Sequence, residues 1–563
     1  MIGHRALLGI ATAVLLSPSA LCAQTVLVRL TDSATSRPVV GALVHLVGDG
    51  GQNEKSALSD DRGRVLFVGI PAGRYHASAE MIGMATSDTE AFDISEGVTR
   101  TYEIRFEASA IQLEGIEVEL DGRCEVRPGG EGLLVAEVWN EARKALSAAA
   151  FTDRVGTYRY ETMTYERSLD RDTKVILSEE QDERTGYMRT PFESRPAEDL
   201  IENGFVQADG AERLYFAPDA NVLLSDAFLD THCFRLVDGG RGPEELIGLG
   251  FEPTGENRRV VDISGALWLD RRSAELRWLE FRYRYLDPDI STADVGGRVE
   301  FQRMPNGTWI VPEWWIRMPV VSVRTDFQGS RSQFIVRYHQ KGGRVMEARE
   351  SSGRRLGGGV TTGGVEGVVT DSLGLPLRGA RVGIVGSNQE VFSDAEGHFS
   401  ITGLGEGLHQ VRVVAPRLAD LGYVSEPVTG NVTRGELTQV DFRMPSLGDV
   451  LFEACRGVTD RQGLVMLAGL VRDAGGLVTP NATVRVRWTT FDVHRGLGIQ
   501  QRPLGTETTT DAKGFYRFCG VPDDRTLEVT ASLGTLESEP VELWISIEEG
   551  AQVAVLRLPA GQY

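Results

Sequence analysis

Alternating apolar and polar positions recur in three similar stretches of this chain. Residues 59–71 read SDDRGRVLFVGIP, residues 393–405 read SDAEGHFSITGLG, and residues 510–522 read TDAKGFYRFCGVP. Two glycines stand six residues apart in each copy: Gly63 and Gly69, Gly397 and Gly403, Gly514 and Gly520. Asp and hydroxyl side chains bond nearby backbone amides in turns, and glycine adopts positive φ without steric cost. The pattern therefore predicts a turn, a half-buried strand and a second turn at three places.

Related segments flank every copy and extend it to a unit of about 80 to 100 residues. Upstream stand residues 31–46, 370–384 and 472–486, and alternating strands at residues 102–106, 440–444 and 554–558 close the units. The unit resembles the carboxypeptidase regulatory-like domain, a transthyretin-like Greek-key β-sandwich that is also grouped with carbohydrate-binding-like folds. The resemblance implies three sandwiches, at residues 24–110, 365–446 and 464–560. It implies a fold and no particular activity, because one sandwich fold serves many unrelated functions.

The third copy departs from the other two at two glycine positions. Asn481 stands where the other units have a glycine before their second strand, and Asp524 stands in place of Gly73 and Gly407. Glycine suits turns because it carries no Cβ. We therefore expect weaker turns in the third sandwich.

The middle of the chain, residues 121–345, follows a different pattern. Between residues 132 and 151 apolar side chains recur at steps of four, with acids early and bases late, which predicts an amphipathic helix. The face of this helix consists of Leu134, Val138, Ala142 and Leu146. Long strand-like runs follow, at residues 157–169 and in a hairpin at residues 265–286.

The second arm of that hairpin alternates strictly. Leu279, Phe281, Tyr283 and Tyr285 share one face of it, and Glu280, Arg282 and Arg284 share the other. The expected fold class is therefore mainly β. It consists of three Greek-key β-sandwich domains and a middle α+β domain with a helix on a wide antiparallel sheet.

A helix followed by a wide sheet is similar to the half-barrel of periplasmic lipoprotein carriers, which hold lipid chains in an apolar trough. Aromatic rings can line such a trough or grip sugar rings. The possible ligand contacts in the middle domain are Trp309, Trp314, Trp315 and Tyr283. Packing of the same rings into a core, with no ligand, is the alternative.

The N-terminus has the pattern of a secretory signal peptide, residues 1–23, with Arg5 before an apolar run at residues 6–16. We expect cleavage after Ala23, and lipidation at Cys22 is the rival hypothesis. Five lysines against 54 arginines suggest a GC-rich bacterial genome. The expected location is periplasmic, outer-membrane-associated or extracellular. A Gly-rich stretch at residues 351–364 is expected to be a flexible linker.

A net charge of −21 is expected to repel nucleic acid and anionic lipid surfaces. No stretch approaches the 18 uninterrupted apolar residues of a membrane-spanning helix. None of the eight histidines has a glutamate three residues on, and His76 with Glu80 is the nearest approach to that zinc motif. We therefore expect no catalytic, cofactor-binding or metal-binding residues. Glu313, beside the tryptophans, is the one acid that invites inspection, and a solvated strand end explains it.

Four cysteines remain after removal of the signal peptide: Cys124, Cys233, Cys455 and Cys519. An even number in an exported chain favours disulfides, and three pairings are open. Cys124 and Cys233 both fall in the middle domain, and Cys455 and Cys519 flank and enter the third sandwich. Pairing within domains is therefore expected, and four buried thiols are the alternative.

Three classes of function compete. The first is an exported, non-catalytic cell-envelope protein whose sandwiches are binding or spacer modules for a protein or a glycan. The second is a periplasmic carrier or sensor that holds an apolar ligand in the middle domain. The third is a hydrolase with its site in the middle domain. Ligand identity and oligomeric state are left open.

Overall fold

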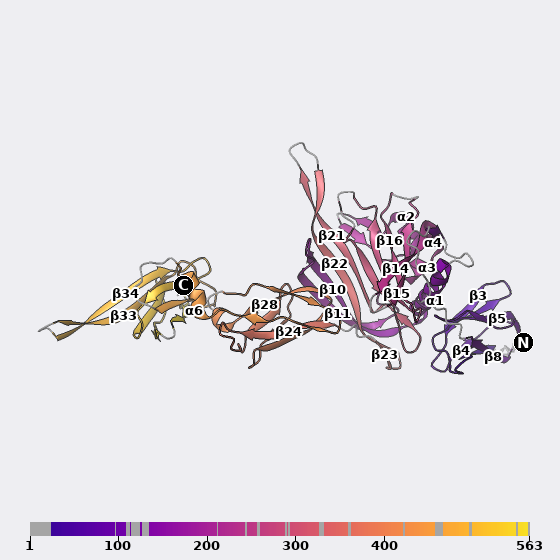
Figure 1. Ribbon diagram of the computed structural model, residues 1–563, viewed down its shortest axis with the longest axis horizontal. Coiled ribbons are helices and arrows are strands. Elements are labelled where there is room, and N and C mark those ends of the chain that lie inside the picture. The colour runs from indigo at the N-terminus through magenta and orange to yellow at the C-terminus, as the bar shows by residue number, and fades with distance from the viewer. Residues whose placement is uncertain are drawn as a thin grey trace, which may run out of the picture. The chain divides into compact units, whose positions relative to one another are not determined.

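The computed structural model describes residues 24–95, 97–107, 113, 124–126, 134–210, 212–241, 245–255, 259–287, 290, 293–325, 331–357, 362–419, 423–456, 465–494, 498–547 and 550–560. The predicted signal peptide lies outside these residues. Strands dominate and helices are few, as predicted (Figure 1). No helix in the described part of the chain is long and apolar enough to cross a membrane.

The chain divides into two compact units. Unit 1 contains Met1–Thr164, Asp182–Met318 and Lys341–Gly359, and unit 2 contains Tyr165–Gln181, Pro319–Gln340 and Val360–Tyr563. Unit 1 thus holds the first sandwich and most of the middle domain. Unit 2 holds the second and third sandwiches together with two segments from long strands of the middle domain. The domain boundaries expected from the sequence stay a prediction.

The first sandwich consists of two sheets around one core. The first sheet has the order β4-β1-β8 and the second has β3-β2-β5, with β6 and β7 both pairing with β5. The strands are β1 (Thr25–Asp32), β2 (Leu43–Gly48), β3 (Asn53–Leu58), β4 (Arg64–Val68), β5 (Gly73–Glu80), β6 (Ser87–Asp88), β7 (Phe92–Ile94) and β8 (Thr99–Phe106). Strand β1 pairs antiparallel with β4 and parallel with β8. Alternate residues of these strands, such as Val26, Val28 and Leu30, fill the core.

The second sandwich repeats this connectivity. Strand β24 pairs antiparallel with β27 and parallel with β30 and β31, and β25 lies between β26 and β28 in the second sheet, which β29 joins through β28. The elements are β24 (Gly363–Thr370), β25 (Arg381–Ile384), β26 (Glu390–Phe392), β27 (His398–Leu404), β28 (Gly407–Val414), α5 (Pro416–Ala419), β29 (Val428–Val432), β30 (Leu437–Gln439), β31 (Phe442–Arg443) and α6 (Leu447–Ala454).

The third sandwich has the same connectivity again. Strand β32 pairs antiparallel with β35 and parallel with β39 and β40, and β33 lies between β34 and β36 in the second sheet. Its strands are β32 (Val465–Arg472), β33 (Thr483–His494), β34 (Gly498–Thr509), β35 (Phe515–Val521), β36 (Thr526–Leu533), β37 (Leu536–Glu537), β38 (Val541–Trp544), β39 (Ala551–Val553) and β40 (Leu556–Arg557). Each of the three sandwiches encloses its own core.

The predicted turns are present in all three copies. The glycines at Gly63, Gly397 and Gly514 have φ of 65°, 78° and 72°. The acid that opens each turn accepts two backbone N–H groups through one oxygen: Asp60 from Arg62 and Arg64, Asp394 from Glu396 and His398, and Asp511 from Lys513 and Phe515. Asn481 takes φ of 57°, close to the 74° of Gly41, because asparagine tolerates the left-handed region.

The middle domain is built on a helix and a wide sheet. Helix α1 (Leu134–Val155) contacts β14, β15 and β17, and Trp139 of the helix lies 5.4 Å from the ring of Phe234 on β14. Val138, Ala142 and Leu146 are fully buried, whereas Leu134 is 44% exposed, so the predicted apolar face begins one turn later than expected. The predicted amphipathic helix is otherwise confirmed.

The strands of the middle sheet run in the order β11-β10-β22-β21-β18-β17-β16-β15-β14-β9. Their bounds are β9 (Glu125–Val126), β10 (Tyr158–Asp170), β11 (Ile176–Met188), β14 (His232–Arg241), β15 (Glu245–Pro253), β16 (Asp262–Asp270), β17 (Leu276–Arg284), β18 (Gly296–Glu300), β21 (Glu313–Thr325) and β22 (Arg331–Arg349). The remaining elements are α2 (Ala197–Asn203), β12 (Val206–Asp209), β13 (Glu212–Tyr215), α3 (Ala220–Leu224), α4 (Asp226–Thr231), β19 (Gln302–Arg303), β20 (Trp309–Ile310) and β23 (Arg355–Gly357).

The predicted hairpin corresponds to β16 and β17, which pair antiparallel from Asp262 and Arg284 onward. Leu279, Phe281 and Tyr283 are buried, and Glu280, Arg282 and Arg284 are exposed, as the alternation predicts. Tyr285 is the exception. Strand β17 ends at Arg284, and Tyr285 turns to a φ of 61°.

The first sandwich is joined to α1 by buried polar contacts. Glu141 is fully buried; one carboxylate oxygen accepts the Gly83 N–H at 2.7 Å and the other lies 2.6 Å from the Lys144 ammonium. Lys144 also donates to the carbonyl of Met84 at 2.6 Å. A Cβ on Gly41 would lie 2.3 Å from the Cα of Gly307, so only glycine allows this backbone contact. Within unit 1 the sandwich is therefore packed against its neighbour.

The predicted linker, residues 351–364, contains more regular structure than expected. Strand β23 pairs with β22 in this stretch, Leu356 is 5% exposed, and β24 already begins at Gly363. Residues 358–361 lie outside the described part. Part of the stretch expected to be a flexible linker is therefore in strands, and Leu356 of β23 lies in the core beside Tyr160 and Met304. The linker role of the stretch stays a prediction.

Both disulfides join the cysteines that the sequence pairs within domains. Cys124 bonds to Cys233 in unit 1, and Cys455 bonds to Cys519 in unit 2. Cys455 is the C-cap of α6, whose N-terminus carries a capping box between Ser446 and Asp449. The second disulfide therefore ties the helix that precedes the third sandwich to strand β35.

Candidate functional site

Two of the four aromatic residues proposed as ligand contacts are core residues. Tyr283 is fully buried, and its hydroxyl donates to the carbonyl of Phe216 at 2.9 Å. Burial raises the pKa of Tyr283 well above its usual value. Trp309 is 1% exposed, and its backbone N–H donates to the hydroxyl of Thr152 of α1 at 3.2 Å. A ligand could reach these rings only by displacing the packing around them, which corrects the expectation of an apolar trough at this place.

Trp314 and Trp315 are half-buried neighbours on β21, so their side chains lie on opposite faces of the strand. Trp314 packs on Phe192, with ring centroids 5.2 Å apart, and Trp315 lies under the guanidinium of Arg317 at 5.0 Å. The structure does not bring the four rings together in any of the grooves considered below. A ligand role for Trp314 or Trp315 stays a prediction.

Glu313 differs from its expected environment. It is 5% exposed and accepts from the guanidinium of Arg344, which is also buried, at 2.9 Å. The expected solvated strand end is therefore wrong. A buried carboxylate needs such a partner, because an unpaired buried charge is strongly unfavourable.

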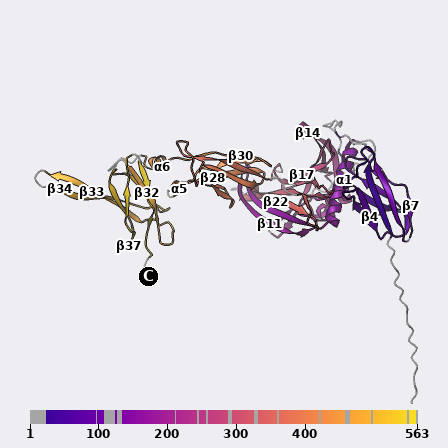
Figure 2. The ribbon, with the colours of Figure 1, turned by 90° about the horizontal axis from the view of Figure 1, so that it is seen from below.

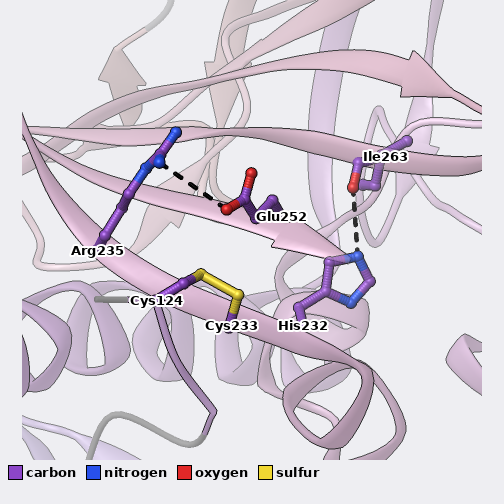
Figure 3. The surroundings of a disulfide bond; sticks show 6 residues. All are labelled: Cys124, His232, Cys233, Arg235, Glu252 and Ile263. Atoms are coloured by element: carbon purple, nitrogen blue, oxygen red, sulfur yellow. Dashed lines mark hydrogen bonds and ion pairs between the residues drawn. A yellow bond between two sulfur atoms is a disulfide. The ribbon is translucent and has the colours of Figure 1, made fainter. Parts of the chain in front are cut away.

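Three groups that could ligate a metal meet at one place in the described residues: Cys124, Cys233 and Glu252. The two sulfur atoms are bonded to each other, as Figure 3 shows. Metal ligation by cysteine requires free thiolates. In the oxidised protein this cluster is therefore a disulfide beside a carboxylate.

A polar groove of about 410 Å³ lies next to this disulfide on the outer face of β14 to β17. Small residues form its floor, since Ala266 of β16 lies opposite Gly250 of β15 and Ser264 lies two positions along. Charged side chains and one aromatic ring form its sides: Arg235, Glu252, Glu280, Arg282, Arg284 and Trp268. We call this the charged groove.

The register of the strands explains why these side chains converge. Cys233 lies opposite Glu252, Ser264 opposite Arg282, and Ala266 opposite Glu280, so one face of four neighbouring strands carries the whole set. Figure 3 shows Arg235 and Glu252 side by side above the disulfide, and their side-chain atoms are 3.8 Å apart. The disulfide joins β14 to the segment that contains β9, and so holds one end of the groove.

The charged groove offers the planar guanidinium groups of two arginines as hydrogen-bond donors. Arg282 and Arg284 are exposed, lie two residues apart on one face of β17, and form no ion pair with another described residue. Guanidinium groups bind carboxylate, phosphate and hydroxyl oxygens in a fixed planar geometry. The groove can therefore hold an extended polar partner. The alternation of β17 placed Glu280, Arg282 and Arg284 on one face, but Arg235 and Glu252 join them only through strand pairing over longer distances.

A second cluster of acids lies near the end of α1. The pKa of the Asp153 carboxyl is raised to about 7, mainly by burial; a hydrogen bond from Thr190 opposes the rise, and the charges of Asp219 and Glu193 add to it. Asp219 also caps α3, since its carboxylate accepts the Val222 N–H at 2.9 Å. Because Asp219 caps α3, its position in this cluster of acids has a structural reason that needs no ligand.

The fold and the charged groove define a multidomain β-sandwich protein with a ligand-sized groove on its middle sheet. Two of its sandwiches are carboxypeptidase regulatory-like domains, since the model of that family matches residues 25–107 and 364–445. The matches leave out the third sandwich, which was expected to belong to the same family. Its strand connectivity is nevertheless that of the other two.

Three solved structures illustrate the likeness, and each is remote. The shaft pilin spaA of Lactobacillus rhamnosus GG is 9% identical, with 36% of this chain and 99% of that chain covered and a TM-score of 0.15. BcpA, the major pilin subunit of Bacillus cereus, is 8% identical, with 95% and 99% covered and a TM-score of 0.14. The TIE protein of Bacillus anthracis is 12% identical, with 63% and 64% covered and a TM-score of 0.16. Scores this low carry no argument about function. No curated protein matches the chain.

Proposed function

We propose that this chain is an exported, non-catalytic cell-envelope protein whose sandwiches are binding or spacer modules for a protein or a glycan. The repetition of one strand connectivity in three separately cored sandwiches carries this proposal. A module that closes over its own core can be repeated along a chain without a shared active site. The hydrogen-bonded turn and the strands of each copy give the module its shape and its exposed surface.

Two disulfides within domains support the export part of the proposal. Disulfides persist in oxidising compartments outside the cytosol and are rare within it. The predicted signal peptide also supports a location outside the cytosol. The mature protein is then expected to begin near Gln24 in the periplasm, at the outer membrane or outside the cell.

The charged groove is the proposed partner surface of the middle domain. Its paired and unpaired charges suit an extended polar chain, such as an envelope polypeptide or polysaccharide, better than an apolar lipid. A carrier of apolar ligands is less well supported, because Tyr283 and Trp309 are packed in the core. No specific observation favours a hydrolase.

A capture experiment with the full mature chain tests this proposal. Immobilised protein is exposed to envelope extract, and the bound protein and polysaccharide fractions are each quantified. The variant Arg282→Glu with Arg284→Glu should lose most of the captured material, because it reverses the charges of the two exposed arginines of β17 that line the groove. A matched control, Arg159→Glu with Arg184→Glu, changes two exposed arginines of β10 and β11 and should capture as the wild type does. Equal capture by all three proteins would contradict the groove as the partner surface.

A further inference from the structure

The outer face of the third sandwich carries a hollow of about 580 Å³ with exposed aromatic rings. Phe491 of β33 is 61% exposed and Trp544 of β38 is 57% exposed, and both line this hollow. Polar side chains surround them: Arg487, Thr489, Asp524, Arg525, Thr526, Glu528 and Glu542. We call this the aromatic groove. Large exposed rings that converge on one hollow indicate a binding surface.

The register gives the spacing of the two rings. Strand β36 lies between β33 and β38, with Arg487 opposite Glu528 and Thr526 opposite Trp544. Trp544 therefore lies two strand spacings, roughly 10 Å, to the side of β33, and Phe491 lies about 7 Å further along. Two rings at this separation can stack on different units of one extended chain, and the hydroxyls of Thr489 and Thr526 point to the same face between them.

This surface belongs to the third sandwich alone among the three. Residue 93 of β7 and residue 431 of β29 occupy the strand position of Trp544, and they are Asp93 and Asn431. Strand β33 spans 12 residues, whereas β2 spans 6 and β25 spans 4. Phe491 lies in the added length, and Figures 1 and 2 both show β33 and β34 extending past the rest of the third sandwich. The sandwich fold therefore forms without Phe491 or Trp544, since the other two copies lack both rings.

The charges around the rings nearly cancel. Arg487 lies 3.7 Å from Glu528, and the other charged residues that line the hollow are Arg525, Asp524 and Glu542. A groove with one surplus negative charge disfavours anionic chains. Alternating guanidinium and carboxylate groups beside aromatic faces supply both donors and acceptors for hydroxyl groups.

We propose that the aromatic groove binds a neutral oligosaccharide of several sugar units. The proposal deepens the proposed function and rests on it for the role of the sandwiches as binding modules. Sugar rings present apolar faces that stack on Trp544 and Phe491, and their hydroxyls bond to the charged and hydroxyl side chains between. A protein partner is less well matched, because the centres of protein interfaces are depleted of Asp and Glu, and Asp524, Glu528 and Glu542 line this groove.

Titration calorimetry on the full mature chain tests the proposal. The probes are hexasaccharides of β-1,4-glucose, α-1,4-glucose, β-1,4-N-acetylglucosamine, β-1,4-mannose and β-1,4-xylose. At least one probe should bind, and Trp544→Ala should weaken its binding about tenfold or more, since it removes one stacking face. Phe491→Ala should weaken it about three- to tenfold. Phe392→Ala, which removes a ring that is 66% exposed on the second sandwich, should leave the affinity unchanged.

The outcomes separate this inference from the proposed function. Failure of every neutral probe to bind, or binding that Trp544→Ala and Phe491→Ala leave unchanged, overturns the oligosaccharide site. Capture of an envelope polypeptide that depends on Trp544 would overturn it as well. The variant with Arg282→Glu and Arg284→Glu should bind the probes normally, so loss of partner capture by that variant tests the charged groove alone.

Discussion

A hydroxyl at the start of each repeated turn carries two buried hydrogen bonds. Thr510 accepts the Ala482 N–H and donates to the carbonyl of Thr479, both at 2.8 Å. Ser59 and Ser393 make the same two bonds in the other sandwiches, to Ala42 and Val39 and to Ala380 and Leu377. The hydroxyl thereby satisfies backbone groups that water cannot reach. One small side chain thus fixes the corner where two strands of each sandwich meet.

Replacing Thr510 with valine should therefore be costly. Thr510→Val keeps the shape of the side chain and leaves a buried N–H and a buried carbonyl unpaired, which should lower the free energy of unfolding by about 2 to 4 kcal/mol. Thr510→Ser keeps the hydroxyl and serves as the matched control. Urea denaturation followed by tryptophan fluorescence measures both. A valine variant as stable as the serine variant would show that the corner does not depend on this hydroxyl.

The raised pKa of Asp153 predicts a dependence of stability on pH. Its carboxyl has a pKa of about 7 in the folded chain and an ordinary value of 3.8 when unfolded. Between these values the folded state holds a proton that the unfolded state has released, so the contribution of Asp153 to stability falls as pH rises from about 4 to 7. The total fall is on the order of 4 kcal/mol.

Asp153→Asn should remove this dependence. Its stability relative to the wild type should increase between pH 4 and pH 8, measured by denaturation at each pH. Asp172→Asn, at an exposed acid on a turn, provides the control. The same difference between wild type and Asp153→Asn at every pH would contradict the raised pKa.

Much of the local structure follows from the sequence, and most of the site does not. The turns at Gly63, Gly397 and Gly514 were predictable because glycine and its neighbouring acid determine them locally. Trp309 is buried on β20, a strand that packs against the distant helix α1, and the convergence of Phe491 and Trp544 depends on the pairing of separate strands. Neither of these arrangements can be predicted from a short stretch of sequence, because each depends on residues far apart in the chain.

At the scale of elements, α1 is the connection between the first sandwich and the middle sheet. Its apolar face packs on the sheet, and its Glu141, Arg143 and Lys144 reach the sandwich. The sequence placed Arg143 and Lys144 late in the predicted helix, but α1 continues to Val155, so both lie near its middle, away from the end of the helix dipole. The sequence gave no sign of their partners. Arg143 pairs with Glu80 at 2.9 Å and Lys144 is 5% exposed.

Breaking the buried Glu141–Lys144 pair should be strongly destabilising. Lys144→Met leaves the carboxylate of Glu141 buried without its cation, which should lower the free energy of unfolding by about 3 to 5 kcal/mol. Adding Glu141→Leu should recover part of the loss, because the unpaired charge is then gone. Lys513→Met, at an exposed turn, is the control and should change stability little. A loss from Lys144→Met no larger than that of the control would argue against a buried pair.

The disulfide between Cys455 and Cys519 links α6 to the third sandwich. It closes 64 residues of chain, and restriction of the unfolded state by a loop of that size contributes about 4 kcal/mol in the chain-entropy model. Cys455→Ala with Cys519→Ala should therefore make β35 the least protected of the repeated strands in hydrogen exchange. Protection of β35 equal to that of β27 in this variant would show that the third sandwich does not need the bridge.

At the scale of the whole molecule, the chain repeats one sandwich three times and varies its surfaces. The cores of the three copies are built alike, whereas the charged groove belongs to the middle sheet and the aromatic groove to the third sandwich. The family model matches the first two sandwiches and does not match the third. Variation of surface over a constant scaffold is how one fold comes to serve different partners.

We propose that the protein is exported and modular, with one disulfide in the middle domain and one between α6 and the third sandwich. Peptide mapping by mass spectrometry under non-reducing conditions, applied to the protein isolated from its own cells, tests it most directly. We expect a mature chain that begins near Gln24, with one crosslink between Cys124 and Cys233 and one between Cys455 and Cys519. A chain that retains Met1, with four free thiols or a crosslink from Cys233 to Cys455, would contradict it.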